Sequence, residues 1–205
     1  MTTPQEDFWQ NEITENYVRD NSVFDEQLGL IAWEKMLSKI DKLDILSYLD
    51  CGSNIGRNVA FLEKVLPSAS ANIVEIAQGP FDECIKNFKV EKSFLGPIKN
   101  ANFDRKFDLV FTIAVLIHLN PDDLLDSISR MYEMSSRYIL IGEYFNRTPV
   151  TIRYRGEDER LFKRDFGKLF VDNFACKVID YGFLWGHDYD TAGFDDITYW
   201  LFEKK

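Results

Sequence analysis

The residues from 45 to 67 constrain the fold of this chain more than any other segment, because three structural signals follow one another there. An apolar run ends at the acid Asp50 and predicts a buried strand. A turn with two glycines, Gly52 and Gly56, comes next, and an amphipathic pattern then predicts a helix that stops at Pro67. Glycine lets the backbone approach a ligand, and a helix start offers unpaired N–H groups. The segment therefore predicts a nucleotide-type cofactor site at the carboxyl edge of a parallel sheet.

The spacing of the glycines distinguishes between classes of cofactor. A dinucleotide fingerprint requires G-x-G-x-x-G. Counted from Gly52, Asn54 and Arg57 occupy the positions of the second and third glycines, which disfavours a nicotinamide or flavin enzyme. The acid two residues before one glycine, with a second glycine four residues later, resembles motif I of the Rossmann-like S-adenosylmethionine (SAM) methyltransferases. The alternative is an ordinary strand-to-helix turn that needs glycine for its angle.

Two later segments favour the cofactor interpretation. Residues 71–76 form a second strand-like run that ends near Glu75, 19 residues beyond Gly56, where a carboxylate can accept hydrogen bonds from ribose hydroxyls. Residues 107–121 give an apolar strand that leads into a segment containing His118. We therefore expect SAM as the cofactor. The residues expected to contact it are Asp50, Cys51, Gly52, Ser53, Asn54, Gly56, Glu75, Ile76, Ile98 and Thr112.

Composition narrows the class of protein. The 205 residues suit a single domain, and contents of 45% hydrophobic and 15% aromatic residues fit a packed globular core. The net charge of −10 disfavours nucleic-acid binding. The three cysteines form no CxxC pair, so neither a zinc site nor a disulfide framework is expected. With no signal-peptide pattern and no apolar run of about 18 residues, we expect a cytoplasmic protein without membrane contact.

Hydrophobic periodicity predicts alternating helices and strands, hence a mainly parallel sheet. We expect one domain (1–205), with residues 1–40 as an N-terminal helical cap or lid and residues 41–205 as a Rossmann-like core. The expected helices cover residues 24–40, the motif helix up to 66, 80–88 with Pro80 at its start, 120–135 with Asn120 as N-cap, and 158–174. The expected strands cover 45–50, 71–76, 93–98, a run from 107, and 137–145, followed by a hairpin of 177–185 and 196–204.

Longer strings resemble one narrower group. They are DFWQNEITENYVRDN (7–21), VLIHLNP (115–121), YILIGEYFN (138–146), TIRYRGEDERLFKRDF (151–166), DYGFLW (180–185) and DDITYWLFEK (195–204). Together they resemble the methylases associated with pseudaminic acid biosynthesis, over nearly the whole chain. The resemblance implies a Rossmann-like class I methyltransferase fold: a seven-stranded, mainly parallel sheet with its last strand antiparallel and helices on both faces. It also implies a small acidic sugar of the nonulosonic type, or its nucleotide-activated derivative, as substrate.

Methyl transfer is an in-line displacement, so the protein mainly aligns the reactants, and a hydroxyl acceptor also needs a base. We expect His118 as the first candidate base, since imidazole titrates near neutral pH, and Glu143 as a second base or a substrate ligand. A capping or core histidine and a strand-end acid are the structural alternatives. Guanidinium groups recognise carboxylate and phosphate, which points to Arg153 and Arg155. The residues expected to bind substrate are Tyr17, Tyr144, Asn146, Arg153 and Arg155.

A second class of function stays open at this point. The family usually carries a lysine and a glycine before the VLIH string, and this chain has Ile113 and Ala114 there. The missing lysine favours a protein that binds SAM or S-adenosylhomocysteine (SAH) without turnover, as a partner in glycan assembly. The oligomeric state is not indicated by the sequence.

Overall fold

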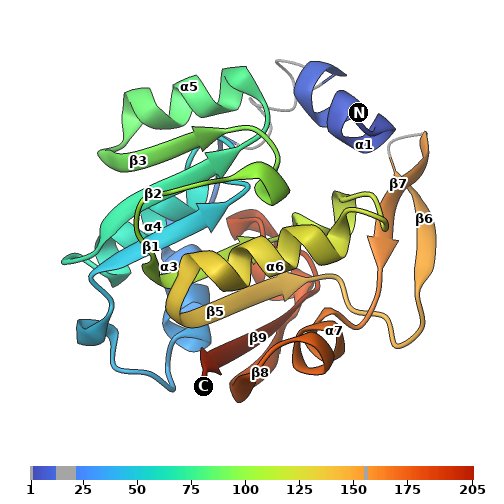
Figure 1. Ribbon diagram of the computed structural model, residues 1–205. Coiled ribbons are helices and arrows are strands. Elements are labelled where there is room, and N and C mark those ends of the chain that lie inside the picture. Colours follow the sequence, from blue (N-terminus) through green and yellow to red (C-terminus); the bar gives the residue numbers. More distant parts are fainter. Residues whose placement is uncertain (1, 13–21, 155–156) are drawn as a thin grey trace.

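The computed structural model describes residues 2–12, 22–154 and 157–205, without the side chains of residues 12 and 157–159. Its centre is a seven-stranded sheet with the strand order β3-β2-β1-β4-β5-β9-β8 (Figure 1). The strands are β1 (Ser47–Cys51), β2 (Ser70–Glu75), β3 (Val90–Leu95), β4 (Phe107–Ile113), β5 (Ser135–Glu143), β8 (Cys176–Leu184) and β9 (Ile197–Lys204). The first five pair in parallel, and β9 pairs antiparallel with both β5 and β8. This confirms the predicted seven-stranded sheet with an antiparallel last strand.

Helices cover both faces of the sheet, as predicted. The longer ones are α3 (Glu26–Met36), α4 (Arg57–Val65), α5 (Gln78–Asn87), α6 (Leu124–Met134) and α7 (Phe166–Asn173). Trp33 of α3 and Phe61 of α4 belong to the core on one face, and Ile128 of α6 and Phe170 of α7 belong to the core on the other. Figure 1 shows α6 in front of the sheet and α3 behind it. Every residue of β1 is buried, as expected for a central strand covered on both faces.

Short helical segments connect the main elements and contribute to the rim of the sheet. They are α1 (Pro4–Asp7), the π-helix η1 (Phe8–Glu12), the 3-10 helices η2 (Lys42–Asp44), η3 (Ile98–Asn100), η4 (Leu116–His118) and η5 (Asp190–Ala192), and α8 (Gly186–Tyr189). Figure 1 shows α1 above the carboxyl edge of the sheet, beside the hairpin formed by β6 (Val150–Tyr154) and β7 (Glu157–Lys163). Segments far apart in the sequence therefore approach the same edge.

The β6–β7 hairpin corrects the helix predicted over 158–174. Residues 157–163 pair antiparallel with the β-branched run at Val150, Thr151 and Ile152, and α7 begins only at Phe166. Two features explain the difference. The β-branched run supplies a strand partner, and the Asp165 side chain caps the later helix by accepting from the Lys168 N–H at 2.8 Å.

Several other boundaries differ from the predictions, and three of them bear on the site. α6 begins at Leu124, because the Asn120 side chain accepts from the Asp122 N–H and forms a turn there. α5 begins at Gln78, two residues before Pro80. β3 covers 90–95, so Ile98 belongs to η3 and not to the strand.

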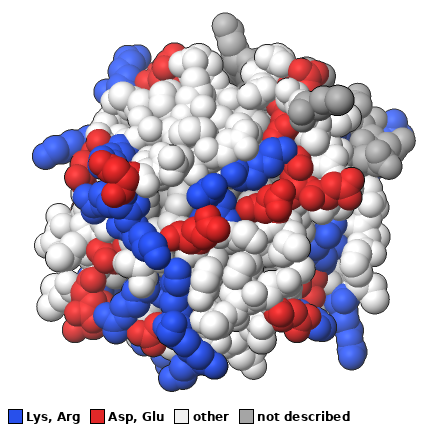
Figure 2. All heavy atoms as spheres, in the orientation of Figure 1, with Lys and Arg blue, Asp and Glu red and all other residues white. Residues whose placement is uncertain are grey.

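The surface carries both signs of charge. Figure 2 shows basic and acidic side chains interspersed on the face seen in Figure 1. Several are paired, including Arg130 with Glu133 at 2.9 Å and Arg105 with Glu91 at 3.0 Å. Among the described residues, no helix has the length and apolar character needed to cross a membrane.

Candidate functional site

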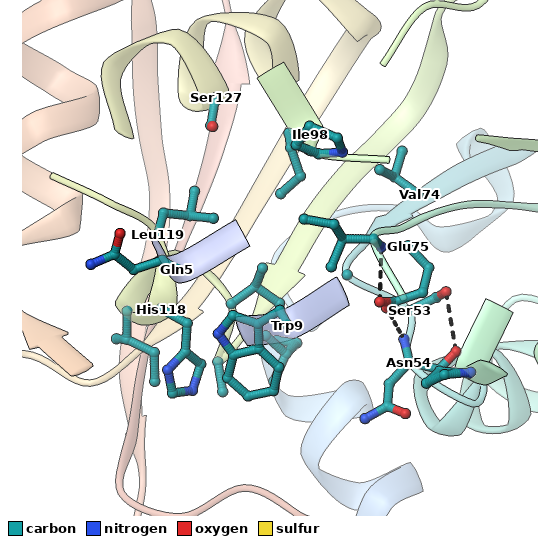
Figure 3. Close-up of a pocket in the computed structure, with 18 of the residues that line it drawn as sticks. Gln5, Trp9, Ser53, Asn54, Val74, Glu75, Ile98, His118, Leu119 and Ser127 are labelled. Atoms are coloured by element: carbon teal, nitrogen blue, oxygen red, sulfur yellow. Dashed lines mark hydrogen bonds between the residues drawn. The ribbon is translucent and has the colours of Figure 1, made fainter. Parts of the chain in front are cut away.

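A cavity of about 310 Å³ opens at the carboxyl ends of the parallel strands (Figure 3). Its wall is formed by the turn after β1, the end of β2, the segments after β3 and β4, and the N-terminal helical segment. Figure 3 shows Ser53, Asn54 and Glu75 on one side, and Trp9 and His118 on the other. This is the edge at which open α/β sheets bind ligands.

The turn after β1 forms part of the wall through Gly52, Ser53 and Asn54. Gly52 and Gly56 have φ angles of 97° and 92°, in the region that favours glycine. A Cβ atom on Gly52 would lie 2.5 Å from a methyl group of Val115. Gly56 does not line the cavity, so its glycine serves the turn and not a ligand. The glycines that define the motif thus have a conformational requirement, and Gly52 adds close packing beside the cavity.

Glu75 ends β2 and joins the turn to it. Its Oε2 accepts from the Asn54 N–H at 2.7 Å, and its Oε1 accepts from the N–H groups of Ile76 and Ala77 at 2.8 and 2.9 Å. Burial raises the pKa of Glu75, while these backbone donors oppose that rise. Glu75, Ile76 and Ile98 all line the cavity. The structure thus brings together the turn, the acid and the two apolar residues that the sequence indicated.

Three other residues expected at the cofactor lie within the sheet and not on the cavity wall. Asp50, Cys51 and Thr112 are fully buried. Neither carboxylate oxygen of Asp50 has a hydrogen-bond partner among the described residues. Burial raises the pKa of Asp50 to about 8, and the neighbouring Asn58 side chain opposes this rise. Asp50 shares the sheet face of Tyr48, because alternate residues of a strand face the same side.

His118 lies on the cavity wall at the end of η4. Its Nδ1 is 2.8 Å from the carbonyl oxygen of Arg160. A carbonyl oxygen only accepts, so Nδ1 carries the hydrogen and Nε2 is the acceptor of the neutral ring. The ring centroid lies 4.6 Å from that of Trp9 and 5.0 Å from that of Tyr154. His118 is therefore oriented by one backbone contact and held between two aromatic rings.

Glu143, at the end of β5, is fully buried and does not line the cavity. Its Oε1 accepts from the N–H groups of Val115 and Leu116 at 3.1 and 3.0 Å, and its Oε2 accepts from the Ile117 N–H at 3.3 Å. Burial raises the pKa of Glu143 to about 7 despite these three donors. In this arrangement the carboxylate holds the segment that carries His118.

The N-terminal segment covers part of the cavity, since Gln5, Glu6 and Trp9 line it. Lys99 Nζ lies 2.9 Å from a Glu6 carboxylate oxygen and 2.7 Å from one of Asp123. Elsewhere, the Asn120 side chain donates to the Gln5 side chain at 3.0 Å, and Arg160 donates to the Pro4 carbonyl at 2.7 Å. The sequence predicted a cap or lid over residues 1–40 but gave no signal for these polar contacts.

The residues expected at the substrate are distributed differently. Tyr144 lines the cavity. Asn146 does not, and its amide donates to the Thr148 carbonyl at 2.6 Å. Arg153 is exposed on β6 and lies away from the wall, whereas Tyr17 and Arg155 fall outside the described residues. The wall also includes residues that sequence reasoning did not select: Gln5, Arg57, Asn58, Tyr154 and Asp195.

Comparison with known proteins identifies the fold. No family model and no curated protein matches the sequence. Among solved structures, a SAM-dependent methyltransferase from Leishmania major is 15% identical, with a TM-score of 0.73, and the match covers 98% of this chain and 81% of that one. The SAM-bound amino pentose methyltransferase CalS10 from Micromonospora echinaspora is 9% identical, with a TM-score of 0.66 and coverage of 96% and 99%. SAM-bound magnesium protoporphyrin IX methyltransferase from Synechocystis PCC 6803 is 12% identical, with a TM-score of 0.63 and coverage of 98% and 95%. The fold is thus the Rossmann-like class I methyltransferase fold.

Proposed function

We propose that this chain is a SAM-dependent methyltransferase that acts on a small molecule. One observation carries the proposal: the Gly52–Asn54 turn and the Glu75 carboxylate line the same cavity at the carboxyl ends of β1 and β2. The likeness to structures that contain SAM supports the choice of cofactor.

The residues present fit SAM. Glu75 supplies a carboxylate for ribose hydroxyls, and Ile76 and Ile98 supply apolar surface for a flat adenine ring. Gly52 lines the cavity at the turn, where its missing Cβ lets Val115 pack against the backbone that would face the methionine part. Arg57 lines the cavity just after the turn, where its guanidinium would meet the methionine carboxylate. Bound SAM supplies a methyl group activated by its sulfonium.

The remaining chemistry belongs to side chains of this chain. The Arg160 carbonyl fixes the tautomer of His118, so Nε2 is the ring atom able to take a proton from an acceptor. Glu143 acts through the three backbone N–H groups that it binds, which makes it a positioning residue. Trp9 closes one side of the cavity and limits the entry of water. Alignment within this enclosure provides most of the rate advantage expected for such a transfer.

We further propose a small sugar as the acceptor, of the acidic nonulosonic type or its nucleotide-activated derivative. The resemblance of the long sequence strings supports this choice, and the likeness to CalS10, an amino pentose methyltransferase, agrees with a sugar. Arg153 lies outside the cavity wall, so it would contact an acidic group only beyond the rim.

Titration calorimetry with SAM and SAH tests the cofactor. Glu75→Gln is expected to weaken binding by about 10-fold or more, because a charged acceptor of ribose hydroxyls is lost. Glu83→Gln is the matched control, since Glu83 lies on α5 and bonds to Asn87 outside the cavity. Circular dichroism of both variants establishes that they are folded. Equal affinity of Glu75→Gln and wild type for SAM would refute the site.

A turnover assay distinguishes an enzyme from the alternative, a protein that binds SAM or SAH without catalysis. Ile113 in place of the family's lysine is the feature that favours a protein that binds SAM or SAH without turnover. Release of SAH in the presence of an acceptor sugar is expected for the enzyme. Tight SAM binding without SAH release from any acidic sugar, free or nucleotide-activated, would contradict the proposed acceptor and favour the non-catalytic function.

A further inference from the structure

The strand order divides the cavity wall into two ends. Glu75, Ile76 and Ile98 follow β2 and β3, on one side of β1. Tyr144 follows β5 and Asp195 precedes β9, on the other side of β4. The first end is the one assigned above to the nucleoside of SAM. The second, which we name the acceptor end, comprises Trp9, His118, Tyr144, Tyr154 and Asp195.

Aromatic rings form much of the acceptor end. Trp9, His118 and Tyr154 are in consecutive ring contact, with centroid separations of 4.6 and 5.0 Å. Tyr144 completes the set, and the ammonium of Lys163 lies 4.9 Å from its ring centroid, outside the cavity wall. Aromatic faces attract cations through their quadrupoles, most strongly where water is excluded.

Asp195 supplies a carboxylate beside Tyr144 on the same cavity wall, and its side chain is exposed. Its Oδ2 accepts from the Tyr144 hydroxyl at 3.5 Å, and its Oδ1 accepts no hydrogen bond from the described residues. Burial raises the pKa of Tyr144, and the Asp195 charge adds to that rise, so the phenol stays protonated and donates to the carboxylate. An acid with an unused oxygen on the same cavity wall as these aromatic faces would attract a cation.

The other charged groups on the wall have partners within the protein, and Glu75 and Arg57 also lie near the turn assigned to SAM, away from the acceptor end. Glu6 and Asp123 pair with Lys99, and the Glu75 carboxylate accepts three backbone N–H groups. Arg57 donates to the Gly193 carbonyl at 3.2 Å, and its charge lowers the pKa of Asp50. The negative charge of Asp195 therefore favours a positively charged ligand at the acceptor end.

We propose that the acceptor group is an amine, bound as an ammonium ion between Asp195 and the aromatic rings, and that the methyl group is transferred to its nitrogen. This inference rests on the proposed function and adds the acceptor atom to it. Asp195 also offsets the repulsion between the ammonium and the sulfonium of SAM. A carboxylate at this position would instead meet a like charge, so any acidic group of the sugar must lie elsewhere.

The transfer balances without a further reactant. The ammonium gives one proton to His118 Nε2, which passes it to water, and leaves a nitrogen lone pair. The lone pair forms the N–CH₃ bond while the S–CH₃ bond breaks and its electron pair stays on sulfur. One ammonium and one SAM cation thus give one methylammonium ion, neutral SAH and one released proton.

The test compares small probes of equal size on the SAH-saturated protein. n-Butylammonium, n-butanol and butyrate are titrated at pH 7 while the tryptophan and tyrosine signals are followed by NMR. The ammonium is expected to bind at least about fivefold more tightly than the alcohol, and butyrate more weakly than either. Equal binding of ammonium and alcohol, or a preference for butyrate, would overturn the proposal.

Two adjacent variants make the test specific. Asp195→Asn is expected to reduce the preference for ammonium over alcohol to less than twofold. Asp196→Asn is the control, because Asp196 accepts from the Gly186 N–H and does not line the cavity. A preference that survives in Asp195→Asn also overturns the proposal. SAH affinity is measured first on each protein, so a failure of the cofactor site is distinguished from a failure of the amine site.

Discussion

Gly52→Ala offers the sharpest test of how the cofactor turn is built. Two effects add at this position. The φ angle of 97° costs an L-residue about 1–2 kcal/mol. The new Cβ would also lie 2.5 Å from a Val115 methyl group, and overpacking of this kind costs about 1–3 kcal/mol. We therefore expect a loss of about 2–5 kcal/mol in the free energy of unfolding, measured by denaturant titration, and weaker SAM binding by calorimetry.

Two further variants separate the causes. Gly79→Ala is the matched control, because a Cβ there has nothing within 4 Å and the residue lies in α5, where alanine is expected to stabilise by about 0.5–1 kcal/mol. In Gly52→Ala/Val115→Ala the steric conflict is reduced while the backbone strain stays. The double variant should therefore show a favourable coupling of about 1–2 kcal/mol. A stability of Gly52→Ala within about 0.5 kcal/mol of wild type would refute the argument.

The remaining predictions concern charges. Folding raises the pKa of Glu143 from 4.5 to about 7, so the folded state binds this proton more tightly, and the contribution of Glu143 to stability should fall by about 3 kcal/mol as pH rises from 4.5 to 7. Glu143→Gln should lack this contribution, so its stability should depend less on pH than that of wild type. Thermal melts in which both proteins show the same pH dependence would contradict the raised pKa of Glu143. Lys99→Met should cost about 1–3 kcal/mol and speed proteolysis near the N-terminus, because two partly buried carboxylates lose their partner. Lys92→Met, which breaks an exposed pair with Asp104, should cost under about 1 kcal/mol, and equal proteolysis of the two variants would count against the Lys99 contacts. His118→Ala should keep SAH affinity within about twofold and lower SAH release from a methylated acceptor by about 10²-fold or more, and an unchanged rate would remove His118 from the chemistry.

The parts of the fold that the sequence predicted correctly depend on local patterns. The strand, turn and helix around Gly52 are contiguous, and the apolar face of α4 repeats at helical spacing. The hairpin of β6 and β7 was missed because Leu161 and Phe162 fit either a helix face or a strand, and only pairing with Thr151 and Ile152 decides between them. Strand pairing is a contact between segments, which a single periodicity does not encode.

The residues of the candidate site likewise divide into those that local sequence patterns predicted and those that they did not. Glu75 and His118 follow directly from the strands that precede them, and both line the cavity. Asp50 was expected at the cofactor from its place in the motif, but the alternation of side chains along β1 directs it into the buried face beside Tyr48. Tyr154 and Asp195 reach the cavity through folding of distant segments, so no local spacing marks them.

The two ends of the cavity also differ in how the chain supplies them. The end at Glu75 is assembled from residues 52–98, one nearly continuous stretch of the sequence, whereas Trp9, Tyr154 and Asp195 come from three segments far apart in it. Trp9 precedes the first strand of the sheet, Tyr154 belongs to the separate β6–β7 hairpin, and Asp195 lies in the connection before β9, so none of the three residues belongs to a strand of the seven-stranded sheet. On the proposed function, evolution or an engineer can change which molecule receives the methyl group by replacing these segments one at a time, while the donor half of the pocket is retained.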